Sequence, residues 1–469
     1  MTLLTEDILT TLIKCRPESQ CRLSDKDFSS LFAECFGSQL RYNVTSHCWY
    51  AFNGSVWVAD ELSAANAARN FAECLLTYSG RLCSTQGGET FKPFIEYIAK
   101  FGSAKRRETI VNDSRAIMQC SMNDFDQKPH LLNFQNGTLD LNTFEFRSHS
   151  AADMLTRCCG CDYMPDSDLS EWEKFLLEIF EGNKDLIEYL QRLCGYFLTA
   201  NTSLERAFML FGSTTRNGKS TFCETISAAL GSYATTITSE TLCDCKRNSG
   251  AANPELAKLK GVRLVIVKEF SQSASLDVAL FKSLTGGDTI STRFLHRDSF
   301  EFKPQFKLLL HTNHLPLVSD STLFSSDRMR IIPFLRHFCE SERDTTMKSR
   351  LTTPQNLAAV LAWAVEGLKR FRSEGEQPPN EVILQTQKYK HDSDKFELFL
   401  SECLIQDKNA RCPISTAYPL YSEWCNKRRL PVDKKSVFID SVKSHNLFLD
   451  FAKLDGEKKY NIITGYNLP

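Results

Sequence analysis

Short apolar runs alternate with longer amphipathic segments through the middle of this chain. The apolar runs cover residues 206–211, 262–267, 306–311 and 330–334, and helices or loops are expected between them. Runs of this length are typical of buried strands, and strands that alternate with helices build a mostly parallel sheet covered on both faces. The pattern therefore predicts an α/β fold with a doubly wound parallel sheet.

The flanking segments follow other patterns. Apolar and aromatic runs surround Asn53-Gly54 and Asn136-Gly137, and Asn-Gly between such runs is a strong hairpin signal. Helical periodicity extends from Glu171 through Leu198 and again from Leu357 to Phe371. A break at Gly375–Pro379 precedes a last segment with helical and strand-like pieces. The sequence therefore predicts helices and hairpins on both sides of the parallel sheet.

The segment after the first apolar run is typical of a nucleotide-binding P-loop. A tight turn between strand and helix directs successive backbone N–H groups at a phosphate chain, at the positive end of the helix. Lys219 then meets the β- and γ-phosphates, and the Ser220 hydroxyl suits Mg²⁺. The expected first glycine is replaced by Ser213, and Gly212 lies one residue too early. The candidate nucleotide-binding residues are Thr214, Thr215, Arg216, Asn217, Gly218, Lys219, Ser220 and Thr221.

The context of this loop favours a phosphate site over a surface loop that happens to contain Gly-Lys-Ser. An apolar strand precedes it, and Phe222, Ile226 and Leu230 give the following segment the spacing of an amphipathic helix. ATP and Mg²⁺ are therefore the predicted cofactors, and ATP hydrolysis is the leading hypothesis.

Polar residues flank the other strands. Glu269 follows the second apolar run and could orient water or support Mg²⁺, although its neighbour is Lys268 rather than a second acid. Asn313 follows the third run, where an amide can hydrogen-bond the attacking water or the γ-phosphate. Arg328 and Arg330 flank the start of the last run, where an arginine could reach a neighbouring subunit's γ-phosphate. A solvated charge, a turn-forming Asn and surface ion pairs are the alternatives for these positions.

Residues 284–304 alternate in a way that predicts a hairpin with a basic tip. Basic and imidazole groups on a protruding hairpin suit contact with a phosphate backbone, although an ordinary solvated turn has the same periodicity. The candidate DNA-binding residues are Arg293, His296, Arg297 and Lys303.

Composition narrows the class of protein. The 469 residues, 42% of them hydrophobic, can bury substantial cores, and a net charge of −1 means that nucleic-acid binding needs a local basic lining. The 18 cysteines are scattered, which indicates reduced thiols, and the CxxC of Cys158 and Cys161 has no second pair to favour zinc. No signal peptide and no membrane-length apolar run is found. A protein of the host-cell cytoplasm, neither secreted nor in a membrane, is expected.

The order of these motifs resembles the superfamily 3 helicases of the AAA+ class, most closely the helicase half of the phage, plasmid and poxvirus-type primase-helicase family. The resemblance rests on residues 214–221, 263–269, 284–290, 293–295, 300–304, 312–314 and 330–334. Weaker similarity at 136–141, 189–198 and 394–425 extends it over most of the chain. It implies an N-terminal α+β region at 1–130, a helical collar region at 131–200, an AAA+ helicase domain at 201–380 and a winged-helix-like domain at 390–469.

The resemblance also implies roles for the candidate ATP-site residues. Lys219 and Ser220 correspond to the Walker A pair, Glu269 to the Walker B acid and Asn313 to the sensor. These four side chains are the implied centre of ATP hydrolysis with Mg²⁺.

The arginine finger and the DNA-gripping tip are implied in the same way. Arg328 is the first choice for the finger, but Asp327-Arg328 stands where relatives often have adjacent arginines, which leaves Arg330 open. His296 and Arg297 correspond to the tip of the DNA-gripping hairpin.

The implied activity is ATP-driven DNA unwinding in the replication of a phage, plasmid or other mobile element. Family members form hexameric rings that move 3′ to 5′ on single-stranded DNA, so single-stranded or forked DNA and further copies of the chain are the expected partners. Residues 1–130, in which Asp124-Phe-Asp126 is a short acidic pair, are too few for a polymerising primase domain, so a separate primase or polymerase is expected. A P-loop kinase and an NTP-binding duplex-DNA initiator or regulator without unwinding activity stay open as alternatives.

Overall fold

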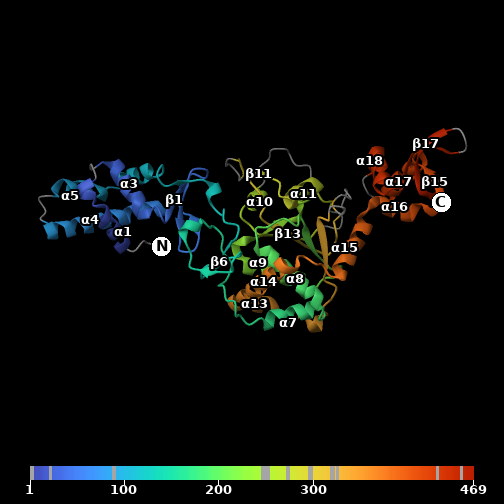
Figure 1. The fold of residues 1–469 in the computed structure, drawn as a ribbon, viewed down its shortest axis with the longest axis horizontal. Coiled ribbons are helices and arrows are strands. Elements are labelled where there is room, and N and C mark those ends of the chain that lie inside the picture. Colours follow the sequence, from blue (N-terminus) through green and yellow to red (C-terminus); the bar gives the residue numbers. More distant parts are fainter. Residues whose placement is uncertain are drawn as a thin grey trace.

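Three bodies follow one another along the chain in Figure 1, with the parallel sheet in the middle one. The computed structural model describes residues 5–20, 24–86, 91–243, 254–270, 275–293, 299–316, 323, 327–428, 432–454 and 458–468. Within these residues, no helix combines the length and the apolar character that crossing a bilayer requires.

The central sheet has five strands in the order β14-β8-β13-β10-β9. All neighbouring strands run parallel, so the predicted mostly parallel sheet is confirmed. A parallel sheet needs helices on both faces, which explains why its strands are nearly continuous apolar runs. The strands are β8 (Ala207–Phe211), β9 (Ala234–Thr238), β10 (Leu264–Lys268), β13 (Lys307–Thr312) and β14 (Met329–Pro333).

Alternate residues of each strand face two different cores. Phe208 and Leu210 of β8 belong to one hydrophobic cluster, whereas Ala207 and Met209 belong to the other. Burying one large apolar side chain stabilises the fold by about 1.5–3 kcal/mol, so this two-faced burial is the main force that holds the sheet. The first cluster packs α7 (Ser170–Ile179), α8 (Lys184–Leu198), α9 (Lys219–Leu230) and α14 (Pro354–Glu374). The second packs α10 (Pro254–Ala257), α11 (Val278–Gly286) and α15 (Asn380–Ser393).

The helical segment predicted over residues 171–198 consists of two helices rather than one continuous helix. Two helices, α7 and α8, occupy this range, and the chain turns between them through positive φ values at Glu181 (50°) and Gly182 (77°). Asn183 then caps α8, because its side-chain oxygen accepts a hydrogen bond from the Leu186 N–H at 3.1 Å. This turn places the end of α7 against the P-loop.

The N-terminal body combines helices with small sheets, as the sequence predicts. The two Asn-Gly hairpins are confirmed: β2 pairs antiparallel with β3, and β5 with β6. The helices are α1 (Thr5–Cys15), α2 (Pro17–Gln20), α3 (Asp25–Phe36), α4 (Ser63–Gln86), α5 (Lys92–Ala99) and α6 (Ala104–Ser114). The strands are β1 (Leu40–Asn43), β2 (Cys48–Phe52), β3 (Trp57–Ala59), β4 (Gln119–Cys120), β5 (Leu131–Asn133), β6 (Thr138–Asp140) and β7 (Phe146–Arg147).

The C-terminal body follows α15, at the opposite side of the sheet from the N-terminal body in Figure 1. Its order is helix, strand, two helices and two strands, and its antiparallel sheet has the order β15-β17-β16. Phe399, Tyr421 and Phe438 form its aromatic core. The elements are α16 (Lys395–Cys403), β15 (Ile405–Pro413), α17 (Ile414–Lys427), α18 (Lys435–Ser444), β16 (Phe448–Leu454) and β17 (Lys458–Asn467).

Cys159 and Cys161 of the CxxC segment are buried, and Cys158 is half-buried. Burial raises the pKa of Cys158 to about 11 and that of Cys161 to about 12, and it raises the pKa of Cys159 further. A metal ligand is the thiolate, which such burial disfavours. These cysteines also belong to no group of three possible ligands in the part of the chain that the structure describes.

Candidate nucleotide-binding site

The P-loop turn depends on glycine at one position. Gly218 has a φ of +85°, and a Cβ there would lie 2.5 Å from the Cγ2 atom of Ile179 in α7. A side chain would therefore strain the backbone and collide with the neighbouring helix. α9 begins at the next residue, so its free N–H groups point into the loop.

Lys219 is buried beside Asn313, the sensor candidate. Its residue is 4% exposed, and its Nζ donates hydrogen bonds to the Asn313 Oδ1 at 2.8 Å and to the Gly212 carbonyl at 3.1 Å. Burial lowers the pKa of Lys219 to about 8, since neither partner is a carboxylate. The amine is thus held by neutral acceptors that a phosphate can replace.

Gly212, which lies one residue too early for the usual motif, has a steric reason to be glycine. A Cβ at this position would lie 2.3 Å from the Phe334 carbonyl oxygen and 2.4 Å from the Asn217 Nδ2. Asn217 in turn donates to the Thr214 carbonyl at 2.7 Å and closes the turn. The close approach of β14 and of the Asn217 amide therefore shifts the required glycine to position 212.

Ser220 and Glu269 line one cavity of about 430 Å³ at the carboxyl ends of the strands. Both residues are exposed, and a hydroxyl and a carboxylate are oxygen ligands of the kind that Mg²⁺ takes. Glu269 has a φ of +38°, and its N–H donates to the His311 carbonyl at 3.1 Å. These donors fit Mg²⁺, and the strained backbone turns Glu269 out of β10 at this edge.

His311 lines the same cavity and was missed by the sequence reasoning. The residue is 4% exposed, and its Nε2 has no hydrogen-bond partner among the described residues. Burial, followed by the charge of Lys268, lowers the pKa of His311, so the imidazole is neutral at pH 7. The apolar run that ends in this histidine was the only sequence signal, and it indicated a strand.

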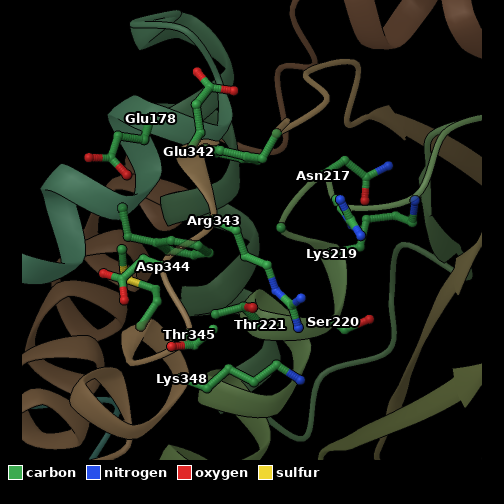
Figure 2. Close-up of a pocket in the computed structure, with 15 residues that line it drawn as sticks. Glu178, Asn217, Lys219, Ser220, Thr221, Glu342, Arg343, Asp344, Thr345 and Lys348 are labelled. Atoms are coloured by element: carbon green, nitrogen blue, oxygen red, sulfur yellow. The ribbon is translucent and has the colours of Figure 1, made fainter. Parts of the chain in front are cut away.

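A second cavity of about 460 Å³ opens on the other side of the P-loop (Figure 2). The P-loop contributes residues 216–221, and α7 contributes Phe175 and Glu178. The opposite wall comes from residues 338–348, which carry no sequence motif. Its charged and apolar lining has room for parts of a nucleotide beyond the phosphates held by the P-loop.

Arg328 and Arg330 lie at the amino end of β14, at the opposite edge of the sheet from the P-loop. β14 and β8 are parallel, with Met329 opposite Ala207, whereas the loop follows Phe211. Five residues of strand span about 16 Å. Within one chain these arginines are therefore not brought to Lys219.

The two arginines have different partners. Arg328 bonds the Glu205 carboxylate at 2.9 Å and the Thr285 hydroxyl at 3.2 Å. Arg330 bonds Glu376 at 3.0 Å, and the Glu376 side chain is only 6% exposed. Breaking the first pair costs little because Glu205 is solvated, whereas breaking the second leaves a buried charge.

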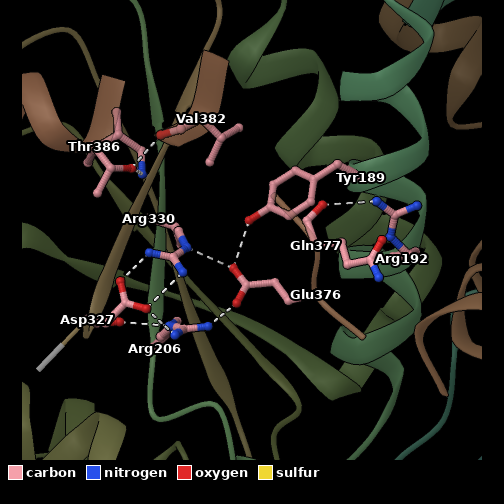
Figure 3. Close-up of polar contacts among 10 residues, drawn as sticks. Tyr189, Arg192, Arg206, Asp327, Arg330, Glu376, Gln377, Val382 and Thr386 are labelled. Atoms are coloured by element: carbon pink, nitrogen blue, oxygen red, sulfur yellow. Dashed lines mark hydrogen bonds and ion pairs between the residues drawn. The ribbon is translucent and has the colours of Figure 1, made fainter. Parts of the chain in front are cut away.

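Arg330 belongs to a closed polar network, shown in Figure 3. Asp327 pairs with both Arg206 and Arg330, and Glu376 pairs with the same two arginines. The Tyr189 hydroxyl also donates to Glu376 at 3.0 Å. This cluster ties the start of β8 and β14 to α8 and to the segment after α14.

The predicted DNA hairpin forms, but its tip is outside the described residues. β11 (Ile290–Arg293) and β12 (Ser299–Phe302) are antiparallel, with Arg293 opposite Ser299. Arg293 is exposed at the end of β11, and Lys303 is exposed directly after the end of β12. His296 and Arg297 lie in the undescribed stretch between the strands, so their role stays a prediction.

A group of three possible metal ligands occurs at the start of the C-terminal body, formed by Asp394, Glu397 and His445. Protein contacts already occupy it. Asp394 caps α16 by accepting from the Phe396 and Glu397 N–H groups, both at 3.0 Å, and its other oxygen lies 3.1 Å from the His445 Nε2. A helix cap joined to an ion pair accounts for this geometry without a metal.

The parallel sheet and the strand–turn–helix around Gly218 define an α/β protein with the backbone geometry of a phosphate-binding loop. Residues 29–181 match the family model described as "D5 N terminal like", and residues 210–328 match a family of unknown function, DUF5906.

Viral proteins named as putative helicases are similar to this chain. L207/L206 of Acanthamoeba polyphaga mimivirus is 25% identical over 81% of this chain and 43% of its own length. The 022R protein of Frog virus 3 is 27% identical over 53% of this chain and 27% of its own length, and 121R of Invertebrate iridescent virus 3 is 27% identical over 64% and 35%. The chain thus spans less than half the length of these relatives.

A solved structure, the apo C-terminal region of NrS-1, aligns with a TM-score of 0.41 and 13% identity, covering 65% of this chain and 77% of that one. The D5-type match over residues 29–181 and the similarity to viral putative helicases support a protein of the superfamily 3 helicase type, in agreement with the motifs.

Proposed function

We propose that this protein is an ATP-dependent DNA helicase. The observation that carries the proposal is the pairing of the P-loop amine of Lys219 with the Asn313 amide at 2.8 Å. It brings a phosphate-binding cation and a group able to hold the γ-phosphate or water to one point. Ser220 and Glu269, which share the neighbouring cavity, supply oxygen ligands for Mg²⁺ when the ion is bound.

A hexameric ring follows from the same proposal. The arginine candidates lie at the sheet edge opposite the P-loop, so a subunit needs a neighbour's arginine to complete its own site. Arg328 is the better finger candidate, since its carboxylate partner Glu205 is 51% exposed and releases it at little cost. Arg330 is better suited to holding the sheet edge.

Other parts of the molecule are suited to contact with DNA and to assembly of the ring. The order of helices and strands in the C-terminal body supports a winged-helix fold, and α7 with α8 are the helices of the collar region that we propose at residues 131–200. We propose the division into residues 1–130, 131–200, 201–380 and 390–469 on this basis. In the ring, the β11–β12 hairpin would grip single-stranded DNA while ATP turnover moves the strand 3′ to 5′.

Unwinding of forked DNA tests the proposal. We expect the parent protein with ATP and Mg²⁺ to separate a fork with a 3′ single-stranded tail, and to appear in electron micrographs as rings threaded by one strand. Lys219→Ala should abolish unwinding and leave DNA binding intact. Monomers without DNA-stimulated ATPase activity would overturn the helicase assignment.

A duplex-DNA initiator that does not unwind is the second candidate, because the C-terminal body could bind duplex DNA by itself. The two functions differ in the fork experiment. The initiator would bind duplex DNA in an ATP-dependent way and leave the strands of the fork paired.

A further inference from the structure

The wall of the 460 Å³ cavity opposite the P-loop is fixed firmly in place. The Phe338 N–H donates to the Arg216 carbonyl at 2.9 Å, and the His337 Nδ1 lies 2.8 Å from the Thr215 carbonyl. At its far end Lys348 pairs with Glu224 of α9 at 2.8 Å. Residues 337–348 are therefore anchored on both the P-loop and the helix that follows it.

Among the described residues, Arg343 of this wall has one carboxylate partner, Glu340 at 3.4 Å, and it shares that partner with Arg216 of the P-loop. The Glu340 side chain is 68% exposed, so both pairs are weak. By contrast, the acids Glu342 and Asp344 are paired with Arg336 at 3.0 Å and with Arg350 at 2.9 Å, respectively.

The Arg343 side chain points into the cavity. Figure 2 shows its guanidinium directed toward the side of Ser220 and Thr221, whereas Lys219 lies on the other side of the loop. Ser220 and Thr221 belong to the first turn of α9, whose N–H groups face the α- and β-phosphates in a P-loop. A guanidinium matches two phosphate oxygens at once, which a lysine amine does not.

We propose that Arg343 binds the α- and β-phosphates of the nucleotide held by the P-loop of its own chain. This inference rests on the proposed ATP site. On binding, Arg343 leaves Glu340 to Arg216, and its guanidinium contacts the phosphate chain from the side opposite Lys219. Because the contact is to phosphates that ATP and ADP share, Arg343 retains the product as well as the substrate.

Calorimetric titration of the full chain with Mg-ATP and Mg-ADP tests this contact. Arg343→Ala should lower the affinity for Mg-ATP and for Mg-ADP by the same factor, on the order of tenfold to a hundredfold. Arg343→Lys should recover part of the loss. Lys219→Ala should lower the affinity for ATP more than the affinity for ADP, because the Lys219 amine contacts the terminal phosphates. Lys258→Ala is the control, because Lys258 pairs with the partly exposed Glu255 and lies outside the cavity lining.

Glu340→Gln provides a test of opposite sign. Removing the carboxylate frees Arg343 from its ion pair. ATP and ADP should therefore bind to Glu340→Gln more tightly than to the parent protein. This gain in affinity should be smaller in the double variant that also carries Arg343→Ala. Glu340 is exposed, so the fold does not depend on it.

Parent-like affinity of Arg343→Ala for both nucleotides, with Lys219→Ala weakened, would overturn the inference and leave the ATP site standing. A loss confined to ATP would move Arg343 to the γ-phosphate and would equally overturn it. Failure of the parent to bind ATP, or indifference to Lys219→Ala, would instead remove the P-loop assignment itself.

Discussion

Buried cations have different partners at the carboxyl edge of the central sheet, where its strands end, and at the amino edge, where they begin. At the carboxyl edge, Lys219 is buried against a carbonyl and an amide, with no carboxylate in contact. At the amino edge, Arg330 is held by the buried Glu376 and by Asp327. The first arrangement leaves a cation ready for a phosphate, whereas the second satisfies its charges within the chain. One edge is therefore suited to exchange of ligands and the other to holding strands and helices together.

Removing Glu376 should produce the largest change in stability. Glu376→Ala leaves Arg206 and Arg330 without their buried partner, which typically costs about 3–5 kcal/mol of unfolding free energy. Denaturant unfolding of the variant measures this. Glu205→Ala is the control, because its pair with Arg328 is solvent-exposed and should change stability by less than about 1 kcal/mol. Equal stability of the two variants would remove the contrast between the edges.

Removing Lys219 should instead affect turnover. Lys219→Ala should lower steady-state ATP hydrolysis by roughly 10²–10³-fold, the usual loss for one preorganised charge-stabilising group. Its thermal midpoint should not fall, since no buried carboxylate is left behind. Lys258→Ala, which removes an exposed pair with Glu255, should behave like the parent in both assays. Unchanged ATP turnover in Lys219→Ala contradicts the P-loop assignment.

Subunit mixing separates the two arginines. Arg328→Ala should lack ATPase activity, and mixing it with Glu269→Gln should restore some, because an intact arginine then meets a neighbour's intact Glu269. The main effect of Arg330→Ala should be a lower free energy of unfolding, because the substitution breaks the ion pair with the buried Glu376. No recovery at any mixing ratio, with subunit exchange verified, counts against a finger in trans. Recovery with a folded Arg330→Ala would shift the finger to that residue.

The lowered pKa of Lys219 predicts a pH dependence of binding. With a free-protein pKa of about 8, the amine loses its proton above that pH, while bound phosphates favour the charged form. ATP affinity should therefore be highest below pH 8 and fall by up to about tenfold per pH unit above it. Titrations from pH 7 to 9 measure this slope at the site, and Lys219→Met should abolish it. An ATP affinity of the parent protein that does not change from pH 7 to 9 contradicts the lowered pKa of the Lys219 amine.

The smallest predicted effect lies in the C-terminal body. The hydrogen bond that His445 donates to the Asp394 carboxylate raises the pKa of His445 above its ordinary value of 6.5. This pair therefore stabilises the fold fully below pH 6.5, and the contribution is lost as pH rises through the raised pKa. His445→Gln should remove that part of the pH dependence of unfolding. A variant with the parent's pH profile would show that the ion pair contributes nothing.

Much of the fold could be read from local patterns. The strands β8, β10, β13 and β14 fall within a residue or two of the predicted apolar runs, because burial on both faces imposes a continuous apolar sequence. The break between α7 and α8 was not predicted, since the apolar periodicity of the two helices continues across the turn at Glu181 and Gly182. Periodicity reports which face is buried, and it is insensitive to a short change of backbone direction.

The candidate site could be read only in part. Its P-loop residues are contiguous and follow from phosphate chemistry, but the Arg343 wall and the unpartnered His311 had no motif. Arg343 is more than a hundred residues from the P-loop along the chain, and long-range contacts of residues 337, 338, 340 and 348 with the loop and α9 bring its segment there.

The sequence by itself determined the strand segments, the hairpins and the phosphate-binding turn, because apolar patterns and turn residues can be read from positions close together in the chain. The tertiary structure decided which charges meet. It joined Lys219 to Asn313, 94 residues apart, and Arg330 to Glu376, and it placed the two arginine candidates at the edge opposite the P-loop. Strand order and helix packing set these long-range contacts, and the free energy of a charge depends on the partner and burial that they provide.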